Sequence, residues 1–303
     1  MPDIAIIGGG AAGLTAGLYA ARGGVDAVVY EELFPGGQAA KTHLIENYPG
    51  FPEGVEGFAI GAKLQEQAEK FGATLSYDGV SALDLKNRTL LSGGREIAFR
   101  ALILCMGASP RTLGLAREEE LTGKGVSYCA TCDGAFFRDK DVAVIGGGDT
   151  ALADALYLAR VCRTVTLVHR RDELRAAAVL QKAAREQDNI HFALSSVCTA
   201  LLGAETLSGL TLRDLKTEQE RELPVSGAFV AVGVSPRTEL VRGQLNLNEG
   251  GYIVTDARMQ TNLPGVYAAG DVRNTPLRQV VTACADGAVA ASEAVAYLAA
   301  GGK

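Results

Sequence analysis

Short apolar runs that end in glycine recur along the chain, and each leads into a segment of helical character. The run IAII at residues 4–7 is followed by a glycine turn and an Ala- and Leu-rich stretch that predicts a helix. The same succession begins again at residue 141 with DVAVI. Near the C-terminus, GVYAA precedes a Gly-Asp turn and a long Ala-rich helix. Strands that alternate with helices in this way indicate an α/β fold.

The first glycine turn has the spacing of a dinucleotide-binding loop. Gly8, Gly10 and Gly13 form G-x-G-x-x-G between the strand and the helix. Glycine suits these positions because the turn is tight, the backbone must approach a pyrophosphate and the helix must pack on the strand. The next strand, DAVVYEE, reaches Glu31, whose carboxylate is placed to accept hydrogen bonds from a ribose hydroxyl. Together these features favour a nucleotide site over a structural Ala- and Gly-rich turn.

A second fingerprint follows 138 positions after the first. Gly146, Gly148 and Ala151 form G-x-G-x-x-A, again between a strand and a helix. Two fingerprints in one chain predict two dinucleotide cofactors. The same offset applied to Glu31 falls on His169, so the ribose acid is absent from the second copy.

The segment HRRDELR stands where that acid would be. An acid suits NAD, whereas a 2′-phosphate is repelled by a carboxylate and needs guanidinium groups. Arg170, Arg171 and Arg175 supply three such groups, and Arg171 and Arg175 have the i, i+4 spacing of neighbours if a helix starts there. The segment therefore favours NADPH as the second cofactor, and the alternative is a solvated basic patch.

Cys129 and Cys132 form a C-x-x-C pair, and Asp133 follows directly. In a reducing compartment such a pair is more often catalytic or metal-binding than structural. Zinc would need about four ligands, and no second C-x-x-C or C-x-x-H follows at a useful spacing. A redox pair without a metal is therefore predicted. The histidines are scattered, at His43, His169 and His191.

Composition and charge exclude several other classes. Six cysteines in 303 residues are too few for a disulfide scaffold, and the net charge of −6 disfavours nucleic acid as a partner. The N-terminus has no secretory signal pattern and no apolar run reaches the roughly 18 residues that span a bilayer, so we expect a cytoplasmic protein without a membrane partner. The unpaired cysteines are predicted to be buried small hydrophobes: Cys105, Cys162, Cys198 and Cys284.

Two similar strands divide the chain into blocks. ALILCMGASPR and AFVAVGVSPRTEL each lead into a Ser-Pro-Arg turn. Because the middle block has a complete nucleotide fold of its own, we expect two Rossmann-like domains in an α/β fold, the second inserted into the first. The first domain would comprise residues 1–113 and 243–303, and the second 114–242, with crossings near Leu113 and Arg242.

Over essentially its whole length the sequence resembles the low-molecular-weight bacterial thioredoxin reductases. This resemblance implies FAD in the discontinuous first domain, NADPH in the inserted domain, and a homodimer. The motifs that carry it are, in order, GGGAAG at 8–13, PGGQ at 35–38, ENYPGF at 46–51, CATCDG at 129–134, GGGDTA at 146–151, HRRDELRA at 169–176, and AAGDV with RQVVTACADG near the end.

The resemblance also implies the residues that hold each cofactor. For FAD these are Gly8, Gly10, Ala11, Ala12, Gly13, Glu31, Gly37, Gln38, Asn47, Asp271, Arg278, Gln279 and Val280. For NADPH they are Gly146, Gly148, Asp149, Thr150, His169, Arg170, Arg171 and Arg175. Two positions depart from the family pattern: Met106 lies in a Cys-Met-Gly sequence where Ala-Thr-Gly is common, and Ala153 stands where a glutamate is common.

The implied activity passes two electrons from NADPH through FAD and the Cys129–Cys132 disulfide to a disulfide of thioredoxin or a thioredoxin-like protein. In the family pattern Cys132 is the flavin-proximal sulfur, Cys129 attacks the partner, and Asp133 moves the accompanying proton. A plain turn carboxylate is the other interpretation of Asp133. Three alternative functions remain: a ferredoxin-dependent flavin thioredoxin reductase, a flavoprotein dithiol oxidase of the same fold, and a nucleotide-sensing module with a structural C-x-x-C.

Overall fold

The computed structural model describes residues 1–42 and 44–302. The chain divides into two compact units. Unit 1 comprises Met1–Ser109 with Ser235–Lys303, and unit 2 comprises Pro110–Val234. The middle of the sequence therefore forms a unit of its own, between two segments that fold together.

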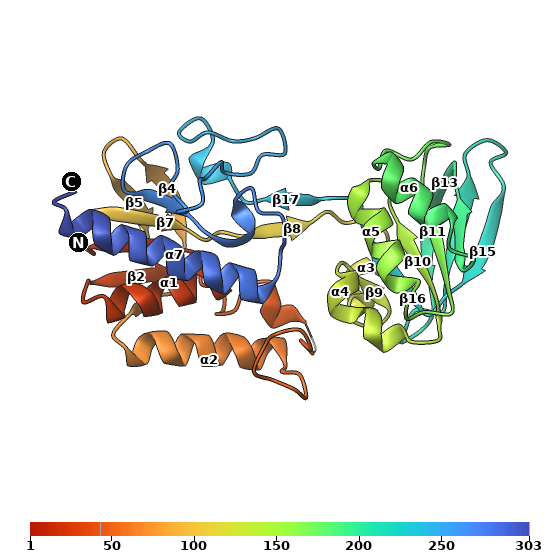
Figure 1. The fold of residues 1–303 in the computed structure, drawn as a ribbon, viewed down its shortest axis with the longest axis horizontal. Coiled ribbons are helices and arrows are strands. Elements are labelled where there is room, and N and C mark those ends of the chain that lie inside the picture. Colours follow the sequence, from red (N-terminus) through yellow and green to blue (C-terminus); the bar gives the residue numbers. More distant parts are fainter. Residues whose placement is uncertain (43, 303) are drawn as a thin grey trace. The chain divides into compact units, whose positions relative to one another are not determined.

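The chain passes from unit 1 to unit 2 along β8 (Ala108–Pro110) and returns along β17 (Val234–Pro236), and these strands pair with each other (Figure 1). The borders of the units fall within this ribbon, four and eight residues before the expected crossings at Leu113 and Arg242. The expectation of Ser-Pro-Arg turns is wrong, because Ser109 and Pro110 lie in β8 and Ser235 and Pro236 lie in β17. These extended segments carry the crossings themselves, and the residues after β8 already pack into unit 2.

Unit 1 contains a five-stranded parallel sheet in the order β18-β7-β1-β2-β3 and an antiparallel sheet β4-β5-β6. Because successive side chains of a strand alternate between faces, Ile4 and Ile6 pack with α1 and α7, and Ala5 and Ile7 pack with the antiparallel sheet. The elements are β1 (Ile4–Ile7), α1 (Ala11–Arg22), β2 (Ala27–Tyr30), η1 (Ala39–Lys41), α2 (Gly57–Lys70), β3 (Thr74–Ser76), β4 (Val80–Asp84), β5 (Thr89–Ser92), β6 (Arg95–Ala98), β7 (Ala101–Leu104), η3 (Glu239–Val241), β18 (Val266–Ala268), η4 (Gly270–Val272) and α7 (Val280–Ala299).

Unit 2 repeats this design with a parallel sheet β12-β11-β10-β16-β9 and an antiparallel sheet β13-β14-β15. Val142 and Val144 of the central strand face α5, and Ala143 and Ile145 face the antiparallel sheet. The elements are α3 (Glu118–Leu121), β9 (Val126–Ser127), α4 (Ala130–Asp133), η2 (Gly134–Phe137), β10 (Asp141–Ile145), α5 (Asp149–Leu158), β11 (Thr164–Val168), α6 (Ala178–Arg185), β12 (Ile190–Ala193), β13 (Ser196–Leu202), β14 (Gly209–Asp214), β15 (Glu220–Pro224) and β16 (Gly227–Val230).

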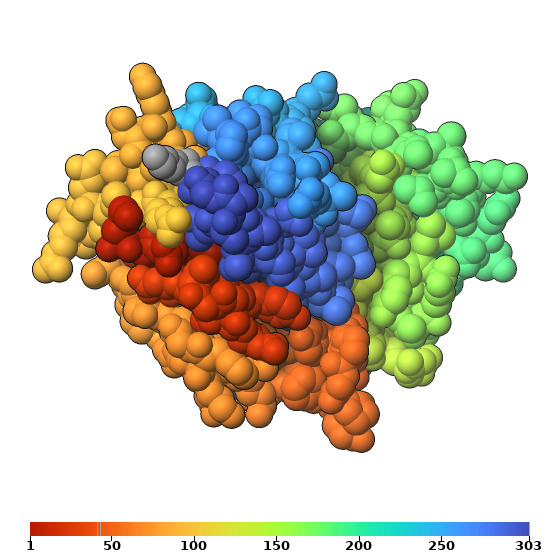
Figure 2. Space-filling view, turned by 60° about the vertical axis from the view of Figure 1, so that its left-hand side comes forward, coloured from red at the N-terminus to blue at the C-terminus, as the bar shows by residue number. Residues whose placement is uncertain are grey.

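Helix α7 is long and apolar enough, by length and composition alone, to cross a membrane. The expectation that no apolar segment reaches about 18 residues is therefore wrong for α7. Its many alanines make the helix apolar despite Asp286 and Glu293. One face of α7 packs on α1, and the two helices lie side by side (Figure 2). A Cβ added at Gly287 would collide with the Ala12 carbonyl oxygen, so glycine allows the close approach of the two helices.

A buried carboxylate holds the chain directly after the first crossing. Glu118 is 4 % exposed, and its oxygens accept hydrogen bonds from the N–H groups of Leu113, Gly114 and Leu115. The hydroxyl of Tyr128 also donates to Glu118, at 2.7 Å. Burial, and next the hydrogen bond to this carboxylate, raise the pKa of Tyr128 above its ordinary value, so the phenol stays a neutral donor.

We expect Glu118→Gln to lower the free energy of unfolding of unit 2 by about 2 kcal/mol, because charged hydrogen bonds are replaced and an amide N–H₂ faces backbone donors. Glu119→Gln is the matched control, because Glu119 lies next in the same helix and is exposed. Urea unfolding followed by far-ultraviolet circular dichroism measures both. Equal stability of the two variants would contradict the structural role of Glu118.

Candidate active site

The first glycine turn, between β1 and α1, is closed to side chains at two of its three glycines. A Cβ added at Gly8 would collide with the Cys105 carbonyl oxygen, and one at Gly13 with the Gly8 oxygen. Gly10 differs, because the nearest atom to an added Cβ is the Cα of Gly37, 3.9 Å away. The middle glycine therefore keeps the N-terminus of α1 open to a ligand, as a pyrophosphate site requires.

The PGGQ loop lies against this turn. The N–H of Gly36 donates to the carbonyl of Gly9 at 2.8 Å. Gly37 has a φ of 59°, in the left-handed region, and a Cβ added there would lie 3.2 Å from the Cα of Gly10. Gln38 follows as the N-cap of η1. Gly37 and Gln38 thus belong to the surroundings of the first fingerprint.

Glu31 lies directly after β2 and binds the glycine turn through its carboxylate. Its Oε2 accepts the N–H of Gly9 at 2.7 Å and its Oε1 accepts the N–H of Leu33 at 3.0 Å. An ionised carboxylate has about four acceptor positions, so it retains capacity for ribose hydroxyls. The residue therefore has a structural contact and free acceptor positions at the same time.

Asn47 and Gln279 are far apart in sequence but hydrogen-bonded, since Asn47 Nδ2 donates to Gln279 Oε1 at 3.0 Å. Gln279 is the N-cap of α7, and its N–H donates to the hydroxyl of Thr282 at 3.1 Å in a capping box. Val280 is the first residue of the helix. The structure therefore gathers three of the expected flavin-side residues at one helix N-terminus.

Two charged groups in this part of unit 1 retain hydrogen-bonding capacity. Burial raises the pKa of Asp271 to about 6, against the lowering effect of Arg278, and among the described residues its carboxylate accepts no hydrogen bond. The Nε of Arg278 is buried and has no hydrogen-bond partner within residues 1–42 and 44–302, while the guanidinium lies 4.5 Å from the centre of the Tyr252 ring. Buried polar atoms such as this Nε are normally paired, and the half-buried Asp271 carboxylate retains acceptor positions, so both groups fit contact with a polar cofactor.

Cys129 and Cys132 are joined by a disulfide, with their Cα atoms 5.3 Å apart. Cys129 is the N-cap of α4, and its carbonyl accepts the N–H groups of Cys132 and Asp133 at 3.2 and 3.1 Å. Both cysteines are half-buried. The pair is therefore a formed two-electron couple on a short helix of unit 2.

Asp133 is held by a residue that the sequence did not point to. The hydroxyl of Ser127, at the end of β9, donates to Asp133 Oδ2 at 2.6 Å and accepts the N–H of Cys129 at 3.1 Å. Burial raises the pKa of Asp133, and the Ser127 hydrogen bond opposes this by stabilising the carboxylate. A carboxyl group with a raised pKa beside a disulfide is suited to proton transfer.

The second fingerprint repeats the steric pattern of the first. A Cβ added at Gly146 would collide with the Ala231 carbonyl oxygen, whereas one at Gly148 would meet no atom of the described part of the chain within 4 Å. His169, at the place of the ribose acid, is 5 % exposed, and its ring lies against Gly147. Burial, and then the charges of neighbouring arginines, lower the pKa of His169, so its ring is neutral near pH 7.

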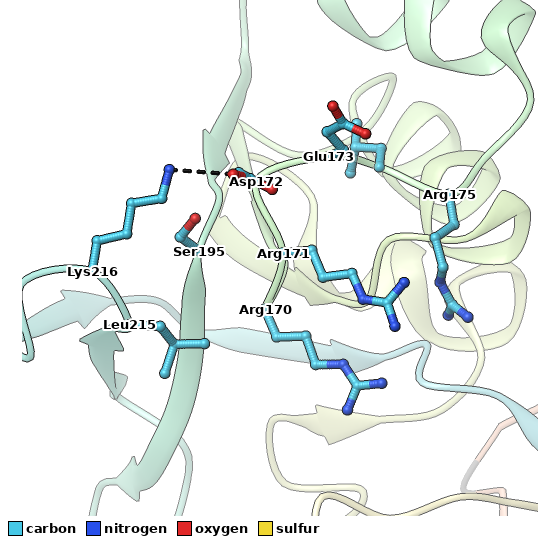
Figure 3. Close-up of a pocket in the computed structure, with 9 residues that line it drawn as sticks. Arg170, Arg171, Asp172, Glu173, Arg175, Ser195, Leu215 and Lys216 are labelled. Atoms are coloured by element: carbon cyan, nitrogen blue, oxygen red, sulfur yellow. Dashed lines mark ion pairs between the residues drawn. The ribbon is translucent and has the colours of Figure 1, made fainter.

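The three predicted arginines line one pocket of about 330 Å³ (Figure 3). Arg170 and Arg171 extend in the same direction in this view. The opposite wall of the pocket is formed by Leu215 and Lys216, from the turn between β14 and β15, and by Ser195, from the loop before β13. These residues lie far from the arginines in sequence, so no motif predicted them. The full lining is Arg170, Arg171, Asp172, Glu173, Leu174, Arg175, Ser195, Leu215 and Lys216.

The expectation that Arg171 and Arg175 are helical neighbours is wrong, because α6 begins only at Ala178. The segment before α6 is irregular and is held by backbone hydrogen bonds. The N–H of Arg175 donates to the Gly147 carbonyl at 2.8 Å, and Asp149 Oδ1 accepts the N–H of the residue before α6 at 2.7 Å. The arginines meet through this loop and not through helical spacing.

Other expected residues take up ordinary positions. Ala11 and Ala12 are buried in the first turn of α1, and Thr150 is exposed in the first turn of α5. Of the departures from the family pattern, Met106 packs half-buried in the core of unit 1 and Ala153 is exposed on α5. Neither departure lies in the disulfide or in the arginine pocket.

The unpaired cysteines do not behave alike. Cys105 and Cys162 are buried as expected, but Cys198 and Cys284 are only half-buried, so the expectation is wrong for these two. The position of His43 lies outside the described residues. Within residues 1–42 and 44–302, no three potential ligands gather as a metal site.

A model of the pyridine nucleotide-disulphide oxidoreductase family matches residues 2–287. A thioredoxin reductase of Streptomyces clavuligerus is 46 % identical over 98 % of this chain and 94 % of its own. A bifunctional thioredoxin reductase/thioredoxin of Mycobacterium leprae is 43 % identical over 98 % of this chain and 66 % of its own. The crystal structure of a thioredoxin reductase from Streptococcus pyogenes has a TM-score of 0.93 and 40 % identity, and covers 99 % of both chains.

Removal of the Ser127 hydroxyl tests how Asp133 is tuned. Because this donor stabilises the carboxylate, we expect Ser127→Ala to raise the pKa of Asp133 further. Carbon-13 NMR titration of the Asp133 side chain measures the change, and Ser226→Ala, at an exposed serine of the same unit, is the control. A pKa that stays constant or falls would show that Ser127 does not tune the carboxyl group.

Proposed function

The chain belongs to the pyridine nucleotide-disulphide oxidoreductase family and is a thioredoxin reductase that uses a flavin and a pyridine nucleotide, and we propose that its cofactors are FAD and NADPH. The observation that carries this proposal is the combination of two nucleotide fingerprints with a formed Cys129–Cys132 disulfide. We further propose a cytoplasmic homodimer, in keeping with the resemblance to bacterial reductases.

FAD is proposed to bind in unit 1. The steric pattern of the first fingerprint leaves room for a pyrophosphate at the N-terminus of α1, and Glu31 has acceptor positions for the ribose. The half-buried Asp271 carboxylate would accept hydrogen bonds from the ribityl hydroxyls. Arg278, Gln279 and Val280 would line the flavin at the N-terminus of α7.

NADPH is proposed to bind in unit 2. The open Gly148 leaves room for its pyrophosphate, and Arg170, Arg171 and Arg175 share a pocket that suits a 2′-phosphate. The neutral, buried His169 offers no carboxylate to repel that phosphate. This pocket also argues for a pyridine nucleotide over ferredoxin as the source of electrons.

A bound flavin would supply two-electron transfer, with NADPH as the source of hydride and the Cys129–Cys132 disulfide as the acceptor. The Cys129–Cys132 bond breaks as it takes up this electron pair, and Asp133 is placed to pass a proton to or from the sulfurs. Cys129 then attacks the partner disulfide and forms a mixed disulfide, with the partner's other sulfur as the leaving group. Cys132 displaces the partner from Cys129, which restores the original disulfide and releases a dithiol.

The proposed partner is thioredoxin or a thioredoxin-like protein. One of the relatives carries both names, reductase and thioredoxin, which supports a thioredoxin as the acceptor of this electron pair. A dithiol oxidase would run the same couple in the opposite direction and would need no site for a 2′-phosphate. The arginine pocket therefore favours the reductase.

Replacement of Arg170 or Arg171 by alanine should weaken the binding of NADPH, and so raise its KM, roughly tenfold to hundredfold. A hydrogen bond between charged groups contributes about 1.5–3 kcal/mol, and one such bond is lost. The KM for NADH, which lacks the 2′-phosphate, should barely change. Steady-state kinetics with both coenzymes measure the ratio, and Arg160→Ala is the control at an exposed arginine of unit 2. An unchanged preference for NADPH in both variants would refute the assignment.

The two cysteines should give different spectra when replaced singly. Cys129→Ser leaves Cys132 as a thiolate beside oxidised flavin, and we expect a long-wavelength absorbance shoulder that disappears at low pH. Cys132→Ser should lack the shoulder but trap an activated carrier as a mixed disulfide. Carrier reduction should fall to background in both variants, while reduction of their flavin by NADPH continues. A shoulder in Cys132→Ser instead would reverse the two roles.

A further inference from the structure

The turn between β14 and β15 is fixed to the arginine segment by a series of backbone hydrogen bonds. The N–H of Leu215 donates to the Ser195 carbonyl at 2.7 Å, and the N–H of Ser195 donates to the Arg171 carbonyl at 2.9 Å. Within the turn, Asp214 Oδ1 accepts the N–H groups of Lys216 and the next residue at 2.8 and 3.0 Å. Leu215 and Lys216 therefore have a defined place opposite the arginines (Figure 3).

Lys216 is held in the pocket by a weak interaction. Its Nζ lies 3.5 Å from Asp172 Oδ2, and the two side chains are 64 % and 67 % exposed. Ion pairs with such exposure contribute about 0–1 kcal/mol. The long lysine stem can therefore turn its ammonium from Asp172 to a stronger anion at little cost in free energy.

The charges of the pocket also favour a doubly charged anion. Four cations line it, the three arginines and Lys216, against the two carboxylates of Asp172 and Glu173. A phosphate monoester carries about −1.5 to −2 charges at pH 7, which matches the positive excess only when Lys216 is included.

Leu215 is an apolar residue in a pocket that is lined mainly by charged side chains. Its side chain is 39 % exposed. Nucleotide pockets combine a few charged groups with apolar surface that covers the flat base. An adenine ring would remove the exposed leucine from water in this position.

We propose that the β14–β15 turn completes the nucleotide site of unit 2, with Lys216 as a fourth cation on the 2′-phosphate and Leu215 as the surface that covers the adenine. This inference rests on the proposed binding of NADPH in unit 2. It assigns the two residues separate effects. Lys216 determines selectivity for the 2′-phosphate, and Leu215 contributes affinity for every adenine nucleotide.

Direct binding to the flavin-loaded protein separates these effects without any turnover. Adenosine 2′,5′-bisphosphate and 5′-AMP differ only in the 2′-phosphate, and isothermal titration calorimetry gives a Kd for each. Lys216→Ala should raise the Kd of the bisphosphate about fivefold to tenfold, because one charge-assisted contact is lost. The Kd of 5′-AMP should stay unchanged, because this ligand has no 2′-phosphate. Lys216→Arg should restore most of the affinity. Leu215→Ser should raise the Kd values of both ligands by the same factor, about threefold to tenfold.

Lys182→Ala is the matched control, because Lys182 is an exposed lysine of unit 2 with a similarly weak ion pair to Glu186. Equal Kd values for wild type and Lys216→Ala, or an equal loss for both ligands, would overturn the role of Lys216. Leu215→Ser without effect on 5′-AMP would overturn the role of Leu215. If wild-type protein does not prefer the bisphosphate to 5′-AMP, the proposal of NADPH itself fails.

Discussion

Close contact between backbone atoms, possible only where a side chain is missing, determines the arrangement of unit 1. The carbonyl oxygen of Gly8 lies where a Cβ of Gly13 would be, so α1 can start directly above β1. The same relation holds between the Ala12 carbonyl and Gly287, which brings α7 against α1. Because α1 and α7 pack in one layer, the proposed FAD site combines residues from the start of each helix.

The redox pair depends on a different kind of constraint, which is the satisfaction of polar groups around a short helix. Cys129 caps α4 with its carbonyl, and Ser127 links the backbone of Cys129 to the Asp133 carboxylate. Tyr128, between them, donates to the buried Glu118. Each residue from Ser127 to Cys129 is therefore tied to the body of unit 2, which holds the disulfide and the Asp133 carboxyl group in a defined relation.

The two units repeat one design, which we propose is adapted to a different nucleotide in each. Both have an enclosed first glycine and an open second glycine in the fingerprint, and both have an antiparallel sheet on the face opposite the helices. They differ at the residue directly after the strand that follows the fingerprint helix, which is β2 in unit 1 and β11 in unit 2. In unit 1 this residue is Glu31, whose carboxylate can accept hydrogen bonds from ribose hydroxyls. In unit 2 it is the buried, neutral His169, and arginines follow it directly in sequence. This position, together with the arginines that follow it, thus distinguishes the two proposed nucleotide sites.

Much of the molecule follows from the sequence alone because its signals are local. Glycine spacing after an apolar strand, a C-x-x-C pair and the alternation of strands and helices depend on neighbours within a few residues. The prediction of a helix at Arg171 was wrong because groups distant in sequence determine the conformation there. The Gly147 carbonyl and the Asp149 carboxylate accept backbone hydrogen bonds from that segment and hold it as a loop. The pairing of Asn47 with Gln279 likewise joins positions that no short pattern connects.

Tertiary structure alone decided which side chains complete each site. Ser127 reaches Asp133 because β9 ends beside α4, and Lys216 enters the arginine pocket because β13, β14 and β15 pair into a sheet. Neither residue has a distinctive local context in the sequence. Their roles depend on the packing of elements far apart in the chain, and such packing is determined by the whole core and not by the spacing of a motif.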